Sequence, residues 1–431
     1  MVRLHRLFCS CVLALCSLLP LAAGATGITN YPVLVNASYW TAQNKDGDKL
    51  VLDAAGVANF NAKVRVASRT VVDLLNYPTS VAGDSLKTKI MDYSVLDDDL
   101  YLHGNKVSDN YKNILRKQTN IAAIPANVSV RYAVVVRRTA VRALPTGEGL
   151  YYYASDKDFD ALQETMLDPG EPVVVLHTSA NGFFYYVQSV NYSGWVSKYN
   201  LALTDKNTWL SFAKPEKFLV VTDANYILKT AGENVLYQQG SRLPIEGEQK
   251  NLYTVIAPVR SQYGGLQKQR LFVQKEAAGL HYGYLPYTTN NILRSAFKFY
   301  NLPYGWGGLK DSVDCSSLIY NAYRTVGIIL PRNADTQELT AGSAHKLSGT
   351  SGERTAVINK LQPGAGLYMD GHTLLYLGSI NGDPYCIHSL GSYYNKGVRQ
   401  REMRVVVSDL QLTRSNGNSF LQELTTAKEF K

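Results

Sequence analysis

The first hydrophobic pattern along the chain is helical and covers residues 28–125. A group of apolar residues there recurs every three or four positions, which predicts a helix that stops before Pro78. Its members are Val57, Phe60, Val64, Val71 and Leu74. A second helix is expected over residues 108–118. The acidic cluster at residues 46–48 is expected to be a turn, because no glutamate follows to close a calcium loop.

From about Val128 onward the pattern changes to short β-rich runs separated by Gly, Pro and Asp. The first block of runs covers residues 132–136, 172–177, 184–189 and 194–197. A second block begins near Trp209, ends near Pro286 and contains residues 218–222, 252–256, 270–274 and 281–285. Short strands at this spacing are typical of barrels and sandwiches, so the two blocks predict two related small β-barrels.

The last pattern starts with helices and ends with strands. Residues 291–300 are expected to be helical, with Thr289 or Asn290 as the cap, and a glycine-rich turn follows at residues 303–308. Residues 314–327 predict a second helix, with Gly327 as its C-terminal cap. Strands are expected over residues 366–369, 372–377, 385–388 and 403–407. Helices followed by an antiparallel sheet indicate an α+β domain.

Composition places these segments in a large globular protein. The chain has 431 residues, 45% of them apolar and 18% charged, with a mean hydropathy of −0.15. These values exclude a polytopic membrane protein and a disordered chain, and the length indicates about two to four domains. The net charge is +9 and no long run of like charge occurs. We interpret this charge either as attraction to an anionic envelope or polymer or as ordinary solubility charge, and expect no nucleic-acid partner.

Residues 1–25 have the pattern of a secretory signal. Two arginines precede an apolar run, and small residues stand at the expected cleavage position. The run is too short for a transmembrane anchor, and Leu15 before Cys16 does not fit a lipoprotein signal. We therefore expect an exported protein, periplasmic or extracellular, that is soluble after cleavage.

One of the two cysteines after residue 25 stands where a nucleophile would. Cys315 follows Asp314 at the expected start of a helix, where unpaired N–H groups and the helix dipole favour a thiolate and can hold an oxyanion. A nucleophilic cysteine also needs a base and a group that orients the base. His372 and His388 stand on successive expected strands. The sequence therefore predicts Cys315 as nucleophile, His372 as base and His388 as the orienting residue.

The two histidines can act together only if they lie on one face of the sheet. A strict two-residue turn at Asn381-Gly382 would put His372 and His388 on opposite faces, because side chains alternate along a strand. We therefore predict either a three-residue loop or a one-residue bulge in this hairpin, for which glycine is suited.

Structural roles are the alternative for each of these residues. Cys315 and Cys386 can form a disulfide, Asp314 can be only a helix cap, and His372 and His388 can be hydrogen-bonded structural residues. Structural roles are also expected for His103, His177, His281 and His345. No paired CxxC or HExxH motif occurs, so neither a metal nor another cofactor is expected.

The motifs around Cys315 resemble those of the NlpC-type cell-wall cysteine peptidases, which have a papain-like fold. The resemblance lies in residues 314–319 (DCSSLI), 304–308 (YGWGG), 330–333 (LPRN) and 363–364 (PG), and in the positions of His372 and His388. Ala365 replaces an acid of the family pattern, and Ser317 replaces a glycine. Upstream, residues 170–173 (GEPV) and 192–196 (YSGWV) resemble a bacterial SH3-like wall module. Residues 28–125 are similar to the helical stabilising region of some family members.

The resemblance implies a multidomain chain with five parts. These are a signal peptide (1–25), a helical stabilising region (26–127), a first SH3-like module (128–205), a second SH3-like module (206–287) and an α+β papain-like peptidase domain (288–431).

The resemblance also implies a reaction and a substrate. A Cys315-His372-His388 triad would hydrolyse peptidoglycan stem peptides through an acyl-enzyme, at the bond between γ-D-glutamate and a diamino acid. The substrate would be a short peptide with a free N-terminal L-alanine, whose amine Asp314 and Tyr192 would hold. Other site residues would be Tyr304, in the oxyanion hole, and Ser316, Arg332 and Asn333, which would bind substrate. We expect a monomer without a cofactor.

Two other functions use the same features. The chain could be a catalytically inactive wall-binding protein that relies on its SH3-like modules. It could also be an amidase or acyl transferase that uses the same triad. Intact Cys315, His372 and His388 favour the peptidase.

Overall fold

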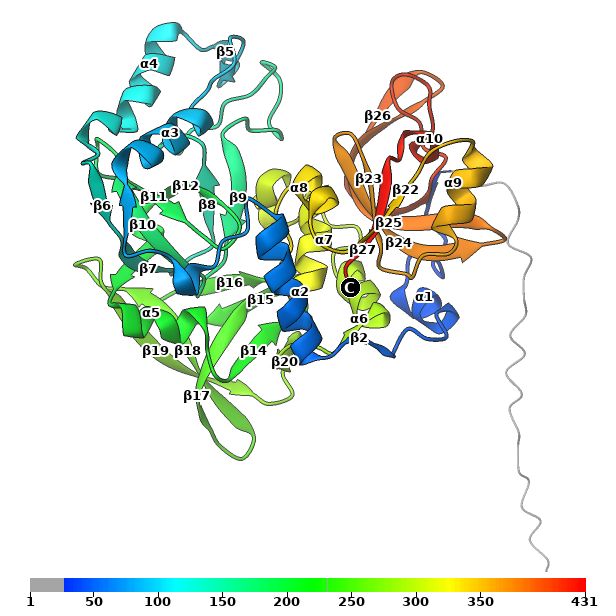
Figure 1. The fold of residues 1–431 in the computed structure, drawn as a ribbon, viewed down its shortest axis with the longest axis horizontal. Helices are drawn as coiled ribbons and strands as arrows, with labels where there is room; N and C mark the ends of the chain where they lie inside the picture. The colour runs from blue at the N-terminus through cyan, green and yellow to red at the C-terminus, as the bar shows by residue number, and fades with distance from the viewer. Residues whose placement is uncertain (1–26, 231) are drawn as a thin grey trace, which may run out of the picture.

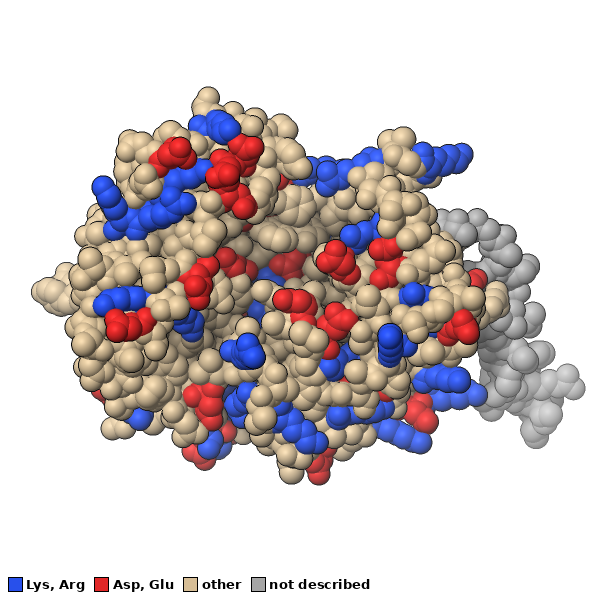
Figure 2. All heavy atoms as spheres, turned by 45° about the horizontal axis from the view of Figure 1, so that its top comes forward, with Lys and Arg blue, Asp and Glu red and all other residues tan. Residues whose placement is uncertain are grey.

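A computed structural model describes residues 27–230 and 232–431 (Figure 1). The expected signal peptide lies outside the described residues, so its cleavage stays a prediction. Within the described ranges, no helix is both long and apolar enough to cross a membrane. Basic and acidic side chains are interspersed over the face shown in Figure 2, in line with the dispersed charges of the sequence.

The N-terminal segment contains both helices and short strands. Helix α2 (Ala54–Ala67) is shorter than expected, because the Ser68 hydroxyl accepts a hydrogen bond from the Thr70 N–H and competes with further helix. Val71 and Leu74 therefore follow the helix rather than belong to it. The other elements are β1 (Ile28–Thr29), α1 (Ala37–Gln43), β2 (Leu50–Leu52), η1 (Leu74–Asn76), β3 (Ser80–Ala82), α3 (Gly83–Tyr93), β4 (Tyr101–Leu102), β5 (Asn105–Lys106), α4 (Asp109–Gln118), η2 (Ile121–Ala123) and β6 (Asn127–Ser129).

This segment packs against two different parts of the chain. Trp40 of α1 lies in the same hydrophobic core as the C-terminal helices, and β1 pairs with β26 (Val398–Asp409) of the C-terminal sheet. Ile90 of α3 instead lies in a core with residues of the first β-sheet. The segment thus connects the first sheet to the C-terminal domain.

The first block of expected strands forms one antiparallel sheet in the order β13-β7-β10-β11-β12-β8-β9. Trp195 is fully buried in it. The bounds are β7 (Arg131–Val135), β8 (Thr139–Arg142), β9 (Gln163–Leu167), β10 (Pro172–Thr178), β11 (Phe184–Gln188), β12 (Ser193–Ser197) and β13 (Leu201–Thr204), with η3 (Lys198–Asn200) before the last strand.

The second block forms a five-stranded sheet in the order β19-β18-β17-β14-β20 and a separate hairpin, β15-β16. Trp209, expected at the start of this block, lies in helix α5 (Lys206–Ala213) and donates to the Val173 carbonyl of the first sheet. The strands are β14 (Phe218–Val221), β15 (Asn225–Lys229), β16 (Asn234–Gln238), β17 (Arg242–Glu248), β18 (Leu252–Arg260), β19 (Leu266–Gln274) and β20 (Leu280–Tyr282).

The C-terminal domain places helices against a sheet of order β1-β26-β25-β24-β23-β27-β22. The α+β arrangement agrees with the sequence pattern (Figure 1). The strands from β23 to β26 pair with their neighbours along the chain, whereas β1 joins this sheet from the N-terminal segment. Its further elements are β21 (Tyr287–Thr288), α6 (Thr289–Phe297), η4 (Trp306–Asp311), α7 (Cys315–Arg324), α8 (Ala334–Leu339), β22 (Ser343–Lys346), α9 (Ser351–Ile358), β23 (Gly366–Met369), β24 (His372–Ile380), β25 (Asp383–Asn395), α10 (Phe420–Glu423) and β27 (Thr426–Glu429).

The sequence predicted the C-terminus of α7 correctly, but it did not predict the N-terminus of α6. Helix α6 begins at Thr289, two residues earlier than expected, because the Thr288 hydroxyl accepts from the Asn291 N–H and caps the helix in place of Thr289 or Asn290. Helix α7 is closed as expected: Gly327 has a φ of 80°. The Ile328 N–H then reaches the Tyr323 carbonyl at 3.1 Å.

Candidate active site

The N-terminus of α7 presents Cys315 as its first residue. Asp314 is the cap: its carboxylate accepts from the Ser317 N–H at 2.9 Å, and the Ser317 hydroxyl accepts from the Asp314 N–H at 2.8 Å. This capping box fixes the backbone on both sides of Cys315. The cysteine is partly exposed and its thiol is free, as is that of Cys386, so the alternative of a disulfide is excluded.

The acidity of Cys315 is the reverse of what the sequence predicted. Burial raises the pKa of its thiol to about 12, and the Asp314 carboxylate beside it adds to the rise. The backbone N–H groups of Thr373 and Ser316 act in the opposite direction but do not outweigh burial. Cys315 therefore rests as a thiol, and a base has to remove its proton during attack.

The predicted departure from a two-residue hairpin is confirmed as a bulge between β24 and β25. Tyr376 pairs with Cys386, whereas Gly378 pairs with Tyr385, so one strand has an extra residue. Gly378 has a φ of 137°, which favours glycine. Because of this shift, His372 and His388 face the same side, and their rings form a hydrogen bond of 2.8 Å between His372 Nε2 and His388 Nδ1.

A chain of hydrogen bonds determines which nitrogen of each histidine carries a proton. The Ser408 hydroxyl donates its only proton to the Asp409 carbonyl at 2.7 Å, so it must accept from His388 Nε2 at 2.9 Å. His388 Nδ1 is then the acceptor, and His372 Nε2 donates to it. The lone pair of His372 Nδ1 is left for the thiol proton.

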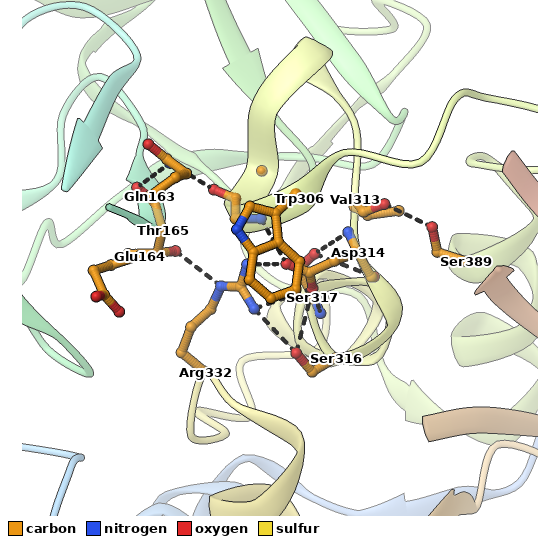
Figure 3. Close-up of polar contacts among 12 residues, drawn as sticks. Gln163, Glu164, Thr165, Trp306, Val313, Asp314, Ser316, Ser317, Arg332 and Ser389 are labelled. Atoms are coloured by element: carbon orange, nitrogen blue, oxygen red, sulfur yellow. Dashed lines mark hydrogen bonds and ion pairs between the residues drawn. The ribbon is translucent and has the colours of Figure 1, made fainter. Parts of the chain in front are cut away.

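This relay is held against the nucleophile by the residues next to it. The Ser389 hydroxyl, adjacent to His388, donates to the Val313 carbonyl at 2.7 Å, two residues before Cys315 (Figure 3). The Thr373 N–H, in the residue after His372, lowers the pKa of the Cys315 thiol. Among the described residues no hydrogen bond joins the thiol to His372 itself. Catalytic contacts of this kind tighten when substrate binds.

Both histidines are neutral in this arrangement. Burial lowers the pKa of His372 to about 3, and the Arg414 guanidinium contributes to the decrease. Burial and the neighbouring His372 lower the pKa of His388 further below its usual range. A neutral His372 next to a protonated thiol is the state in which His372 acts as a general base.

A pocket of about 370 Å³ opens beside Cys315. The first sheet contributes one side of it through Gln163, Glu164 and Tyr192, and the turn between β23 and β24 contributes another through residues 369–371. Helices α7 and α8 lie between these two parts of the chain (Figure 1). The pocket is therefore built jointly by the first sheet and the C-terminal domain.

Asp314 is already fully engaged within this pocket. Its two oxygens accept hydrogen bonds from the Gly307 N–H, the Ser317 N–H, the Ser316 hydroxyl and two nitrogens of Arg332, of which Arg332 Nη2 lies at 2.6 Å. Figure 3 shows Arg332 between Asp314 and Thr165 of β9. Arg332 lowers the pKa of Asp314, so the carboxylate stays charged. No lone pair is left for the substrate amine that Asp314 was expected to hold.

Glu164 of β9 is the carboxylate that remains available, and no motif in the sequence identified it. It accepts a hydrogen bond from the Tyr192 hydroxyl and has no ion-pair partner among the described residues. Burial raises its pKa, and the hydrogen bond from Tyr192 and the charges of Arg332 and Arg142, which act in the opposite direction, do not outweigh burial. The only sequence signal is an acid within a short strand whose two neighbours in the chain, Gln163 and Thr165, are also polar.

The other expected site residues also border the pocket. Asn333 is exposed and forms a side-chain hydrogen bond with Tyr192. The Ser316 hydroxyl is turned to Asp314 and Arg332 rather than to the open space. Burial raises the pKa of Tyr304 well above its usual value, with Cys315 close enough to contribute. The Tyr304 hydroxyl therefore keeps its proton and can donate.

The remaining histidines lie outside the pocket lining and contact local groups. Examples are His177, whose Nε2 lies 3.0 Å from the Asn120 carbonyl, and His345, whose Nε2 lies 3.2 Å from Glu429. Across residues 27–230 and 232–431, no three His, Cys, Asp or Glu side chains are grouped so as to hold a metal ion.

Comparison with known proteins matches two segments of the chain to protein families. Residues 301–413 match the NlpC/P60 family, and residues 150–197 match the SH3 domain of the SH3b1 type. The chain carries a C-terminal NlpC/P60 domain. The NlpC/P60 match includes Cys315, His372 and His388, and the SH3 match includes Glu164 and Tyr192. The family supports a cell-wall peptidase of the cysteine endopeptidase class.

Two relatives extend the likeness beyond these domains. Dipeptidyl-peptidase 6 of Lysinibacillus sphaericus is 24% identical over 240 residues, which are 51% of this chain and 82% of that protein. The structure of an NlpC/P60 endopeptidase from Photobacterium damselae subsp. piscicida superposes with a TM-score of 0.75 at 18% identity, over 94% of this chain and 98% of that one. The similarity in fold thus includes the N-terminal segment and the second sheet.

Proposed function

We propose that this protein hydrolyses short peptidoglycan stem peptides that have a free N-terminal L-alanine, at the bond between γ-D-glutamate and the diamino acid. The observation that carries the proposal is the relay from Ser408 through His388 to His372, which leaves His372 Nδ1 without a proton, one residue from the Thr373 N–H that acts on the Cys315 thiol. A wall-binding protein has no use for such a relay. Export is part of the proposal, since the substrate lies outside the cytoplasm and residues 1–25 have the pattern of a signal.

The reaction begins with a neutral pair. His372 Nδ1 takes the proton of the Cys315 thiol while the sulfur attacks the scissile carbonyl. The Cys315 N–H at the start of α7 and the Tyr304 hydroxyl stabilise the oxyanion. His372 then gives the proton to the leaving amine as the carbon–nitrogen bond breaks. Water attacks the acyl-enzyme, returns a proton through His372 to the sulfur, and releases the acid product.

The free amine of the substrate selects where the enzyme cuts. An ammonium group placed at Glu164 and Tyr192 would supply the cation that Glu164 lacks, and it would remove the cost of burying that carboxylate. The residues between this point and Cys315 would then be the first two of the peptide. The relative's name, dipeptidyl-peptidase, supports the release of two residues from a free N-terminus.

The test uses L-Ala-γ-D-Glu-diamino acid tripeptide with a free or an acetylated N-terminus, and mass spectrometry of the products. We expect the native chain to release L-Ala-γ-D-Glu from the free peptide only, and the Cys315→Ala variant to release none. A matched control is Cys386→Ser, which changes the buried cysteine outside the pocket. Hydrolysis by Cys315→Ala, or equal hydrolysis of the acetylated peptide, would contradict the proposal. Transfer of the acyl group to an added amine instead of water would indicate the transferase.

A further inference from the structure

Arg414 lies in the loop that follows β26 and reaches the edge of the pocket. The loop is held by a bridge between Thr413 and Tyr394 and by a hydrogen bond from the Arg414 N–H to the Asn418 carbonyl. Its guanidinium Nη1 donates to the Asp370 carbonyl at 3.0 Å and lies 3.7 Å from the sulfur of Met369. Both residues line the pocket. A cation is thus fixed beside the turn that leads to His372.

This arginine differs from the other arginines around the site, because those are paired. Arg332 pairs with Asp314, and Arg142 pairs with Asp160. Arg414 has no carboxylate within ion-pair distance among the described residues, and it is partly buried. Its Nε and Nη2 have no protein acceptor in the same set of residues. An anion would find charge and free N–H donors here.

The charge of Arg414 disfavours protonation of His372 in the relay unless an anion binds beside this arginine. Its charge lowers the pKa of the neighbouring His372, which works against the imidazolium that forms during attack. An anion on Arg414 would offset this charge at the moment when His372 takes up a proton. The Glu423 carboxylate is the acid that interacts with Arg414 through space, but among the described residues it forms no ion pair with the guanidinium.

The direction in which the peptide lies in the pocket determines which of its groups would reach Arg414. In the proposed function the amine end lies at Glu164 on the side of β9, and the scissile carbonyl lies at Cys315. The part of the peptide that leaves must continue away from β9, and β23 and β24 lie on that side of α7 and α8 (Figure 1). Arg414 lies on this side, next to the turn between β23 and β24.

Resting on that function, we propose that Arg414 binds a carboxylate of the leaving fragment and so determines which peptides are cut. The carboxylate in question is the one on the amino acid whose amine is released. The enzyme then binds both ends of its substrate, the ammonium group at Glu164 and the carboxylate at Arg414. Peptides that end directly after the scissile residue would be preferred.

The experiment compares two substrates and two variants. L-Ala-γ-D-Glu-L-Lys with a C-terminal carboxylate is compared with the same tripeptide as a carboxamide, and kcat/KM is measured for each. For the native chain we expect the acid to be favoured about tenfold, since a hydrogen bond between two charged groups is stronger than one to a neutral amide. In Arg414→Gln this ratio should fall to about one, mainly through KM for the acid.

The control is Arg399→Gln, an exposed arginine on the neighbouring hairpin whose Nε contacts the Ser392 hydroxyl. It should leave the acid-to-amide ratio at the native value. Arg414→Lys should retain part of the preference. If Arg414→Gln slows both substrates equally, the residue only holds the loop and the inference is wrong. If the native chain cuts acid and amide equally, the inference fails while the proposed function stands. If it cuts neither, the proposed function fails.

Discussion

The N-terminus of α7 and the wall formed by β9 each bring one carboxylate to the same pocket, and the surroundings of the two differ. Asp314 is buried with Arg332 and accepts hydrogen bonds from backbone and side chain, and its pKa is lowered. Among the described residues Glu164 accepts a side-chain hydrogen bond only from the Tyr192 hydroxyl, and burial raises its pKa. The first carboxylate is satisfied by the fold itself, whereas the second is the one that we propose binds the substrate amine.

The difference between the two carboxylates is expected to have its largest effect on the free energy of unfolding. Asp314→Ala leaves Arg332 buried without its partner and removes the cap of α7, so we expect the free energy of unfolding to fall by about 3–5 kcal/mol. Glu164→Gln should leave it unchanged or raise it, because a buried charge without a cation is removed. Denaturant unfolding of both variants at neutral pH measures the difference. Equal losses in the two variants would show that the carboxylates have the same role.

A smaller effect is expected in activity when the second carboxylate is neutralised. Glu164→Gln should lower kcat/KM for the free-amine tripeptide about 100-fold, since a buried charge pair contributes roughly 2–5 kcal/mol. The pH profile separates this from misfolding. As pH falls through its raised pKa, Glu164 gains a proton and loses its charge, so the native enzyme should lose activity on the acid side. The variant should lack this limb, because His372, with a pKa of about 3, stays neutral there.

The smallest effect is expected for the tyrosine beside Glu164. Tyr192→Phe removes one hydrogen bond to the carboxylate without changing any charge, so we expect a loss of about tenfold in kcat/KM and a further rise in the pKa of Glu164. The acid limb of the pH profile should move to higher pH. An unchanged limb would mean that Tyr192 does not act on Glu164.

The sequence was informative where the evidence is local. Side chains alternate between two faces along the strands that carry His372 and His388, and the parity of these positions required either a longer loop or the bulge that is found at Gly378. Asp314 and Cys315 stand at a helix start that the capping pattern identifies. These features depend on neighbours within a few residues along the chain or across one hairpin.

What the sequence did not indicate depends on contacts between distant segments. The pairing of Asp314 with Arg332 joins the start of α7 to the segment before α8. The position of Glu164 near the nucleophile follows from the docking of the first sheet on the C-terminal domain, where Arg332 also donates to Thr165. The acidity of Cys315 was predicted in the wrong direction, because the helix dipole is visible in the sequence and the extent of burial is not. The early cap at Thr288 reflects the pairing of β21 with β2.

The relay of histidines ends at a hydroxyl and a backbone carbonyl, with no acid at its far end. Without an acid at its end, the relay does not cause His372 to remove the proton from the sulfur of Cys315 while no substrate is bound. Peroxides oxidise the ionised form of cysteine much faster than the protonated form. The idle enzyme is therefore protected against oxidative damage, and its sulfur becomes vulnerable only during turnover, when the peptide covers it.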